Sequence, residues 1–164
     1  MPSERNKAVF LDRDGVINRE QSRYVTHLED FIINDGVVEA LKIFRDKNYL
    51  LIVISNQGGI SKGLCTKEEV DYLHLHLQRV MSNKGIEISE VYYCPHHPDV
   101  TNCICRKPDS QMLEKAMARF NINPLQSYFI GDAERDIEAG KKAGVKTIKV
   151  EANQSLMEVV GWVE

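Results

Sequence analysis

Two aspartates, Asp12 and Asp14, stand two positions apart directly after the apolar run Ala8–Leu11, which is predicted to form a strand. Side chains alternate along an extended chain, so the two carboxylates point the same way if the strand continues to Asp14. Two like charges held together require a cation or a shared proton. Seen alone, the segment is also compatible with a solvated turn, because Asp14-Gly15 is a common turn dipeptide.

A hydroxyl and an amide, Ser55 and Asn56, close the second apolar run, and the glycine pair Gly58-Gly59 follows them closely. A hydroxyl next to backbone N–H groups that glycines leave accessible is suited to receiving a phosphate. The segment is not a P-loop, because no Gly-Lys-Ser/Thr sequence follows it. A simple loop is the other interpretation of these residues taken alone.

Cations and further acids follow the third and fourth apolar runs. Arg106 and Lys107 come after the third run. Asp132 stands at the end of the fourth, and Asp136 lies one helical turn beyond it. Individually, these residues are also compatible with a surface charge pair and a helix-capping acid. Together with Asp12 they offer carboxylate ligands for Mg²⁺, positive charge for phosphoryl oxygens and an acid able to act as a nucleophile.

Three of the four cysteines fall within twelve residues, in a segment that also contains histidine. The predicted zinc ligands are Cys94, His96, Cys103 and Cys105. Two short turns with C-x-H and C-x-C spacing that close on one ion satisfy a tetrahedral Cys₃His site, and four protein ligands make it structural. His97 is the alternative imidazole, and Cys65 is expected to be a free thiol. We expect zinc to fix residues 94–105, so that the cations after them reach the phosphate from a constant position.

Alternating apolar and amphipathic segments predict the elements that carry these residues. Strands are expected at 8–11, 50–54, 91–93, 128–130 and 145–150, and helices near 37–44, 66–84, 110–120 and 134–143. This alternation implies an α/β fold with a doubly wound, Rossmann-like parallel sheet. Asp35 is expected to cap the first helix, and Thr66 with Glu69 to form a capping box at the second. Ligands bind beyond the carboxyl ends of the strands in such sheets, which is where the polar groups above lie.

The whole chain has 164 residues, of which 43% are hydrophobic and 27% charged, the proportions of an ordinary globular protein. Without a linker or repeat, residues 1–164 are predicted to form a single domain into which the zinc loop 94–105 is inserted. No apolar run approaches the roughly 18 residues of a membrane span, and the polar N-terminus lacks a signal peptide, so a cytoplasmic protein without membrane partners is expected. A net charge of −3 argues against nucleic-acid binding through bulk charge.

Four segments resemble, in order and over nearly the whole chain, the motifs of the haloacid dehalogenase (HAD) superfamily of phosphatases. They are Phe10–Asn18, Ser55–Ile60, Cys105–Pro108 and Ile130–Asp132. In detail they are most similar to the branch that holds D-glycero-D-manno-heptose-1,7-bisphosphate 7-phosphatases and histidinol phosphatases, which also carries a zinc site. The resemblance implies a HAD-like fold. Because the predicted strands and helices use almost every residue, we expect no cap domain, and we expect loops such as 18–31 to close the site.

The resemblance also implies a role for each motif residue. Asp12 would be the nucleophile, and Asp14 would protonate the leaving oxygen and then activate the hydrolytic water. The residues that would bind substrate phosphate are Ser55, Asn56, Arg106 and Lys107. The expected Mg²⁺ ligands are Asp12, Asp132 and the main-chain carbonyl of Asp14. Asp136 would support Lys107 or a metal-bound water.

The leading hypothesis is a Mg²⁺-dependent phosphatase that acts on a small phosphorylated metabolite through an aspartyl-phosphate. The expected substrate is D-glycero-D-manno-heptose 1,7-bisphosphate at its 7-phosphate, and histidinol phosphate is the alternative. Ala133 bears on this choice, because heptose phosphatases tend to carry a lysine there. The cations predicted near the site are Arg13, Arg19, Arg23, Lys62, Arg106 and Lys107. We expect a monomer.

A receiver-like phospho-acceptor module is the hypothesis from another class, because such modules also take a phosphoryl group on an aspartate in a doubly wound sheet. They usually keep the acceptor after the third strand. Here the third predicted strand leads into Cys94, and the acid pair follows the first strand. The order of the residues therefore favours the phosphatase.

Overall fold

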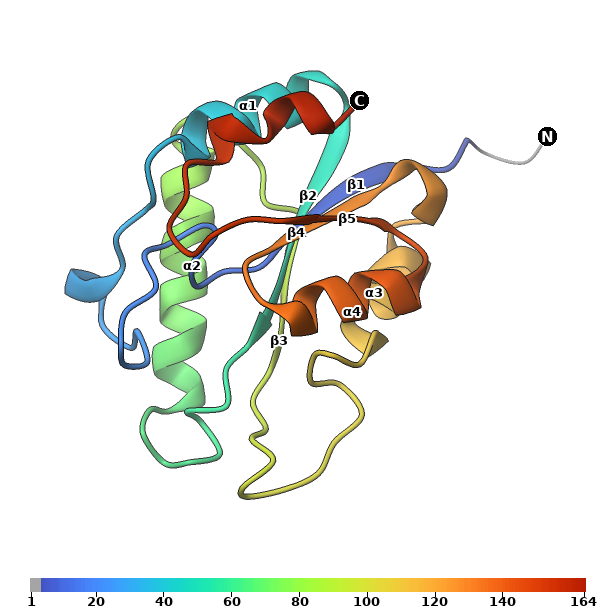
Figure 1. The fold of residues 1–164 in the computed structure, drawn as a ribbon. Helices are drawn as coiled ribbons and strands as arrows, with labels where there is room; N and C mark the ends of the chain where they lie inside the picture. Colours follow the sequence, from blue (N-terminus) through green and yellow to red (C-terminus); the bar gives the residue numbers. More distant parts are fainter. Residues whose placement is uncertain (1–3) are drawn as a thin grey trace.

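Five parallel strands build one sheet within residues 4–164, the part of the chain that the computed structural model describes (Figure 1). The strands are β1 (Lys7–Leu11), β2 (Tyr49–Asn56), β3 (Glu90–Cys94), β4 (Tyr128–Gly131) and β5 (Lys146–Lys149). They lie in the order β3-β2-β1-β4-β5, and all neighbouring strands pair in parallel. The predicted doubly wound α/β sheet is confirmed, with strand ends that differ from the prediction by a few residues.

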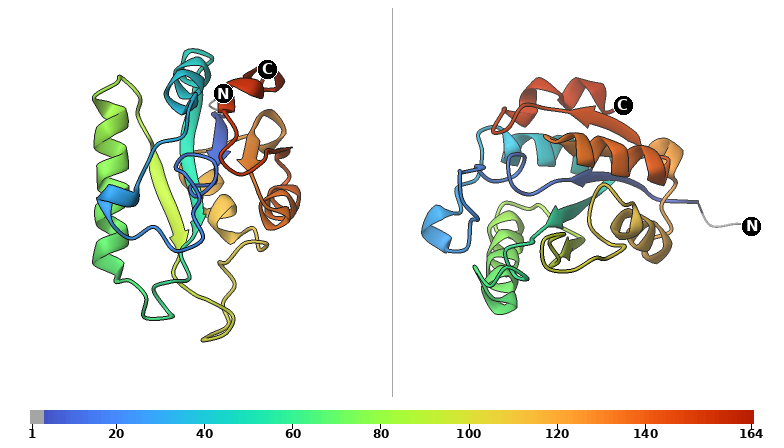
Figure 2. Two further views of the ribbon diagram at one scale, coloured as in Figure 1. Left: turned by 60° about the vertical axis from the view of Figure 1, so that its left-hand side comes forward. Right: turned by 60° about the horizontal axis from the view of Figure 1, so that its bottom comes forward.

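Helices cover both faces of the sheet. The α-helices of the described residues are α1 (Val37–Asp46), α2 (Lys67–Ser82), α3 (Gln111–Arg119) and α4 (Glu134–Ala143). The short 3₁₀ helices are η1 (Leu28–Asp30), η2 (Pro124–Gln126), η3 (Leu156–Glu158) and η4 (Val160–Trp162). α1 and α2 pack on one face of the sheet, and α3 and α4 pack on the other (Figure 2). No helix in residues 4–164 combines the length and the apolar character that crossing a membrane requires.

β1 lies at the centre of the sheet, and its residues alternate between two separate cores. Val9 and Leu11 belong to the core under α1 and α2, whereas Ala8 and Phe10 belong to the core under α3 and α4. All four side chains are fully buried. A strand segment that is buried on both faces must be apolar, which explains why β1 is hydrophobic at every position after Lys7.

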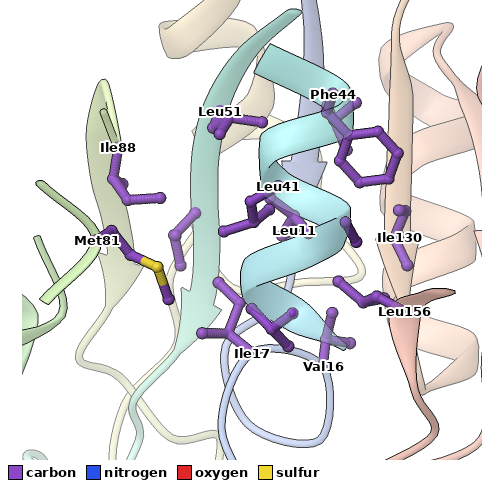
Figure 3. Packing of buried hydrophobic residues seen from close by; sticks show 14 of the residues in the cluster. Leu11, Val16, Ile17, Leu41, Phe44, Leu51, Met81, Ile88, Ile130 and Leu156 are labelled. Atoms are coloured by element: carbon purple, nitrogen blue, oxygen red, sulfur yellow. The ribbon is translucent and has the colours of Figure 1, made fainter. Parts of the chain in front are cut away.

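The C-terminal segment completes the first of these cores. η3 and η4 lie against α1. Leu156 is fully buried in the cluster that also contains Ile130 of β4 and Leu41 of α1 (Figure 3). Val159 and Val163 are buried in the same cluster, so the C-terminal segment is part of the core.

Asn153 ties the start of the C-terminal segment to the loop after β1. Its N–H donates to the carbonyl oxygen of Gly15 at 2.8 Å, and its Oδ1 accepts from the N–H of Glu20 at 2.6 Å. Its Nδ2 donates to the carbonyl oxygen of Glu20 at 3.2 Å. The loop after β1 is therefore held by a residue 133 positions after Glu20.

The helix ends test the predicted caps. At α2, Thr66 Oγ1 accepts from the N–H of Glu69 at 3.1 Å and Glu69 Oε2 accepts from the N–H of Thr66 at 2.9 Å, so the capping box is confirmed. The prediction that Asp35 caps α1 is wrong, because Gly36 occupies the N-cap position without a side-chain bond. Gly36 has a φ of 77°, whereas a capping side chain needs an extended backbone.

The strand order creates a crevice at one edge of the sheet. β1 and β4 are neighbours in space although β2 and β3 lie between them in sequence, so the direction of chain winding reverses between them. Loops that leave such a pair of strands part to opposite sides and leave a binding crevice at the carboxyl ends. Figure 1 shows the loops after β2 and β3 extending from the same edge.

Candidate active site

One buried lysine contacts groups from three parts of the chain that meet at the carboxyl edge of the sheet. Lys107 Nζ lies 2.8 Å from Asp12 Oδ1 after β1 and 2.7 Å from Asp136 Oδ1 in α4. It also donates to the carbonyl oxygen of Ile54 in β2 at 2.8 Å, and the side chain is 1% exposed. Although burial acts against the charged amine, the two carboxylates raise the pKa of Lys107 above its usual value. The predicted phosphate ligand is thus a fixed positive charge between two acids.

Asn56 explains how this lysine reaches the site from the loop after β3. Asn56 Oδ1 accepts from the backbone N–H of Lys107 at 3.0 Å, and Asn56 Nδ2 donates to the carbonyl oxygen of Lys107 at 3.1 Å. The end of β2 therefore clamps the main chain of Lys107. The sequence predicted phosphate binding for Asn56, and the structure adds this positioning contact.

Three carboxylates meet beside the lysine, with oxygens that all lie within 4.8 Å of one another: Asp12, Asp132 and Asp136. Asp132 Oδ1 is buried and has no hydrogen-bond partner within residues 4–164. Burial, opposed by Lys107, raises the pKa of Asp12 to about 8, and burial also raises the pKa of Asp132. Crowded acids of this kind need further positive charge, and their oxygens are the ligands that Mg²⁺ prefers. The cluster therefore fits a magnesium ion.

Gly15 makes room for one of these acids. Its φ is +88°, in the left-handed region, and a Cβ at this position would lie 2.2 Å from Asp132 Oδ2. Both constraints require a glycine directly after Asp14. The Asp14-Gly15 dipeptide, which the sequence also allowed to be a simple turn, lets the ends of β1 and β4 approach closely.

The two oxygens of Asp14 have different surroundings. Oδ1 accepts from Arg13 Nη2 and from Asn18 Nδ2, both at 2.9 Å, and Oδ2 accepts from Gln57 Nε2 at 3.0 Å. Although burial acts to raise the pKa of Asp14, the Arg13 guanidinium and the hydrogen bonds from Asn18 and Gln57 lower it overall. Asp14 is therefore held as a carboxylate in one fixed orientation.

Gln57 is a site residue that the sequence did not single out. Its Nε2 donates both to Asp14 Oδ2 at 3.0 Å and to Ser55 Oγ at 2.7 Å, and its side chain is 3% exposed. It joins the predicted acid–base residue to the predicted phosphate-binding hydroxyl. The available signal was its place inside the Ser55–Ile60 motif.

A cavity of about 760 Å³ opens beside these groups at the carboxyl ends of β1 and β4. Its lining residues are Asp12, Asp14, residues 20–26, Asn56, Leu64, Asp132, Arg135 and Ala152. Arg23 and Arg135 are the cations in this lining. Ser55 and Lys107 are each 1% exposed and lie behind the lining, so they would meet only a group that reaches Asp12.

Two of the predicted cations, Arg13 and Arg106, are bonded to other groups of the protein. Arg13 is fully buried and pairs with Asp14. Arg106 Nη1 donates to the carbonyl oxygen of His96 at 2.9 Å, so the guanidinium braces the loop after β3. Phosphate binding by Arg106 stays a prediction.

The four predicted zinc ligands come together on the loop after β3, with one ligand atom of each within 4.8 Å of the others: Cys94, His96, Cys103 and Cys105. Four of the distances between these atoms run from 3.1 to 3.6 Å. Zinc–sulfur bonds of about 2.3 Å in a tetrahedron separate the ligands by about 3.8 Å, so the cluster fits zinc after a small expansion. The alternative imidazole, His97, accepts from the N–H of Asp99 through Nδ1 at 3.2 Å.

Comparisons with known proteins point to one family. The sequence profile described as haloacid dehalogenase-like hydrolase matches residues 5–150. A D-glycero-beta-D-manno-heptose-1,7-bisphosphate 7-phosphatase of Haemophilus ducreyi is 40% identical in a 147-residue alignment that covers 86% of this chain and 80% of that protein. A D-glycero-alpha-D-manno-heptose-1,7-bisphosphate 7-phosphatase of Photorhabdus laumondii is 36% identical over 88% of this chain and 82% of that protein.

A solved structure shares the fold. The D,D-heptose 1,7-bisphosphate phosphatase from B. bronchiseptica, complexed with magnesium and phosphate, aligns with a TM-score of 0.84 and 26% identity. The alignment covers 94% of this chain and 86% of that one. Since the family profile spans all four motif segments and the relatives match over most of their length, the chain belongs to the haloacid dehalogenase-like hydrolases.

Proposed function

We propose that this protein is a Mg²⁺-dependent phosphatase that transfers the 7-phosphoryl group of D-glycero-D-manno-heptose 1,7-bisphosphate to Asp12 and then to water. The observation that carries the proposal is the acid pair Asp12 and Asp14 at one cavity wall, with Lys107 held against Asp12. Membership of a hydrolase family supports the chemistry, and the names of the relatives support the substrate.

Asp12 is the nucleophile in this proposal. Its Oδ1 accepts hydrogen bonds from Lys107 Nζ at 2.8 Å and from the N–H of Arg13 at 2.9 Å. Because both bonds fall on Oδ1 and fix the carboxylate, we assign Oδ2 to the attack. The attack forms a bond between Oδ2 and phosphorus and breaks the bond between phosphorus and the sugar oxygen.

Asp14 moves the protons of both half-reactions. Asp14 binds a proton from solvent as the phosphorylated substrate enters and gives that proton to the sugar oxygen as the oxygen leaves. It then takes a proton from the water that attacks the phosphoenzyme, which returns it to the protonated form. The second step frees Asp12 and inorganic phosphate. Asp14 Oδ1 accepts from both Arg13 and Asn18, whereas Oδ2 accepts from Gln57, so we assign Oδ2, the less heavily bonded oxygen, to proton transfer.

Positive charge stabilises the phosphoryl group in both steps. Asp12, Asp132 and the main-chain carbonyl of Asp14 would hold Mg²⁺, which supplies neutralising charge to the phosphoryl oxygens when bound. Lys107 supplies a second charge at a position fixed by Asp136. The hydroxyl of Ser55, oriented by Gln57, would donate to a phosphoryl oxygen.

The substrate assignment rests on the remaining cavity wall. A bisphosphate has a second phosphate away from the reacting one, and Arg23 and Arg135 are the cations that the cavity offers to it. Ala133 provides no charge, so Arg135, two residues further on, would take that part. Histidinol phosphate would instead bring an amine, for which Glu20 is an acidic partner in the same wall.

Steady-state kcat/KM values test the substrate directly. The substrates are heptose 1,7-bisphosphate as each anomer, heptose 7-phosphate and histidinol phosphate, each with Mg²⁺. We expect the bisphosphate to exceed heptose 7-phosphate by tenfold or more, since the pair differs only in the second phosphate. A preference for histidinol phosphate would overturn the assignment. The comparison of anomers matters because the relatives are named for both.

A matched pair of variants tests the distal cation. Arg135→Ala should lower kcat/KM for the bisphosphate by about tenfold, the value of roughly one charge-assisted contact, and leave heptose 7-phosphate nearly unchanged. Arg79→Ala removes an exposed arginine near the far end of α2 and should change neither value. Equal losses on both substrates would contradict a role for Arg135 in binding the second phosphate.

We also propose that the cysteine cluster binds structural zinc, that the protein is a monomer and that it resides in the cytoplasm. Reduced thiols, which the cytoplasm maintains, are what the cluster needs to bind metal. The molar mass measured by light scattering during size-exclusion chromatography tests the proposed monomer. The mass of a dimer would contradict it.

A further inference from the structure

A buried histidine approaches the acid–base residue through a buried arginine. His74 in α2 is 5% exposed, and Arg13 is fully buried. Arg13 Nη1 lies 3.1 Å from His74 Nε2, while Arg13 Nε and Nη2 donate to Asp14 Oδ1 at 3.3 and 2.9 Å. The guanidinium thus bridges the imidazole and the carboxylate of Asp14.

The hydrogen-bond chemistry fixes the state of His74. A guanidinium has only donors, so His74 Nε2 must be the acceptor and the ring must carry its proton on Nδ1. Burial, together with the charge of Arg13, lowers the pKa of His74 to about 3, which agrees with a neutral ring. His74 therefore acts on Arg13 as a hydrogen-bond acceptor.

The bond from His74 sets the plane of the guanidinium. Both donors that Arg13 directs at Asp14 end on the same oxygen, Oδ1, so that contact alone leaves the group free to pivot about it. Nη2 also donates to the carbonyl oxygen of Val25, at 3.4 Å, and the remaining nitrogen, Nη1, has its acceptor in His74 Nε2. Holding Nη1 at His74 keeps both Arg13 donors on Asp14 Oδ1, so that Oδ2, which accepts from Gln57, is the oxygen assigned to the reaction.

His74 itself has a rigid support. Its ring lies 5.2 Å from the ring of Tyr93 in β3, measured between centroids. The Tyr93 hydroxyl donates to Asp71 Oδ1 at 2.6 Å, one turn before His74 in α2. Tyr93 thus joins β3 to α2 both at the imidazole and one turn before it, so the position of the imidazole is set by the packed fold.

We propose that His74 is a positioning residue for the phosphatase reaction, which orients Asp14 for proton transfer by accepting a hydrogen bond from Arg13. The inference rests on the proposed function, because it takes Asp14 as the acid–base residue. It adds a requirement that no motif contains: an acceptor at the Nε2 position, 61 positions from Arg13.

Three substitutions of His74 separate positioning from packing. His74→Leu fills the site without an acceptor and should lower kcat by about 10- to 100-fold with KM changed less than about threefold, since misplaced proton transfer affects the chemical step. His74→Gln puts an amide oxygen near the Nε2 position and should restore kcat to within about threefold of the wild type. His74→Asn has the same amide on a shorter side chain that falls short of Arg13, and its kcat should stay low.

The comparison of Gln with Asn keeps the test decisive if the leucine variant does not fold. Equal kcat values for these two folded amides, or a loss that appears in KM alone, would overturn the proposal. His76→Leu is the matched control on the same helix, because the His76 ring meets the ring of Phe31 in a T-shaped contact, and it should change kcat less than twofold.

Asp14→Asn separates failure of this inference from failure of the proposed function. If Asp14→Asn is inactive while His74→Leu keeps wild-type kcat, only the positioning role of His74 is wrong. If Asp14→Asn keeps full activity, or the wild type hydrolyses none of the phosphates tested, the proposed function is wrong as well.

Discussion

At Asp12, one carboxylate oxygen carries the hydrogen bonds that fix the group, and the other is assigned to the chemistry. Lys107 Nζ and the N–H of Arg13 both end on Oδ1. The division is less complete at Asp14, where Arg13 and Asn18 donate to Oδ1 and Gln57 donates to Oδ2, the oxygen assigned to proton transfer. A site arranged in this way aims its reactive oxygens before substrate arrives, which lowers the cost of orientation in the chemical step.

Asp12→Asn is the substitution that tests the nucleophile. We expect phosphate release to fall by about 10⁴-fold or more, the scale of loss when a covalent nucleophile is removed. The amide keeps the volume of the side chain, so circular dichroism and zinc content should not change. Asp46→Asn, at an exposed residue paired with Arg45, is the control that should retain full activity. Turnover that survives in Asp12→Asn would remove Asp12 from this role.

At the residue scale, the sequence predicts which acids and cations gather but not how they are bonded. Asp12, Asp132 and Lys107 follow separate strands, and the rule that ligands bind at the carboxyl ends of parallel strands brings them together. Gln57 and His74 were missed because their partners, Asp14 and Arg13, lie 43 and 61 positions away in the chain. No local pattern of residues encodes such contacts.

At the scale of single elements, α2 carries its own start signal. Thr66→Ala removes the side-chain half of the capping box and should lower the free energy of unfolding by about 1 kcal/mol. Ser110→Ala at α3 is the matched control, because the Ser110 side chain makes no cap hydrogen bond there, and it should cost clearly less. Urea unfolding of both variants measures the difference. Equal losses would contradict the importance of the box.

The loop after β3 depends on its cysteines, since it contains no helix or strand between Cys94 and Gln111 within the described residues. We expect one zinc ion per chain. Cys103→Ser should lower zinc content and phosphatase activity while the far-UV circular dichroism of the sheet persists, because Lys107 sits just beyond the cluster. Cys65→Ser, at the cysteine outside the cluster, should keep both. Purified protein without zinc would contradict the assignment.

Element ends show what spacing alone can and cannot predict. The Thr66 and Glu69 pair has a specific signature and was predicted correctly, whereas Asp35 was predicted as a cap on residue type alone. Gly36 takes the N-cap position there because its left-handed backbone turns the chain directly into α1. The conformation of one glycine outweighed the capping preference of its neighbour.

At the scale of the whole molecule, His74 links the stability of the fold to pH. Its folded pKa, about 3, lies below its ordinary value of 6.5, so the neutral ring contributes its full stability above pH 6.5. That contribution is lost as pH falls from 6.5 toward 3, by about 1.4 kcal/mol per pH unit. Urea unfolding at pH 7, 6 and 5 should therefore show a steeper loss for the wild type than for His74→Gln. Parallel curves would contradict a buried neutral histidine.

The fold class was predictable because β1 and β2 are apolar on both faces, which restricts them to the inside of a layered α/β sheet. The C-terminal segment was not predictable from its pattern. Leu156, Val159 and Val163 are buried although only short 3₁₀ turns connect them. Their burial depends on contacts with α1 and with the sheet residues of the same core, and these contacts exist only in the folded molecule.

The contact of Asn153 with the loop after β1 has a consequence for the order of assembly. A ribosome delivers the four motifs before it delivers Asn153, yet the main chain at Gly15 and Glu20 is bonded to this later residue. When all five strands of a nascent chain have emerged from the ribosome, Asn153 has not, and its hydrogen bonds to the loop that carries Asp14 are still missing. Competence for the reaction is therefore expected only after Asn153 has emerged and bonded to the loop, and not as soon as the four motifs have emerged.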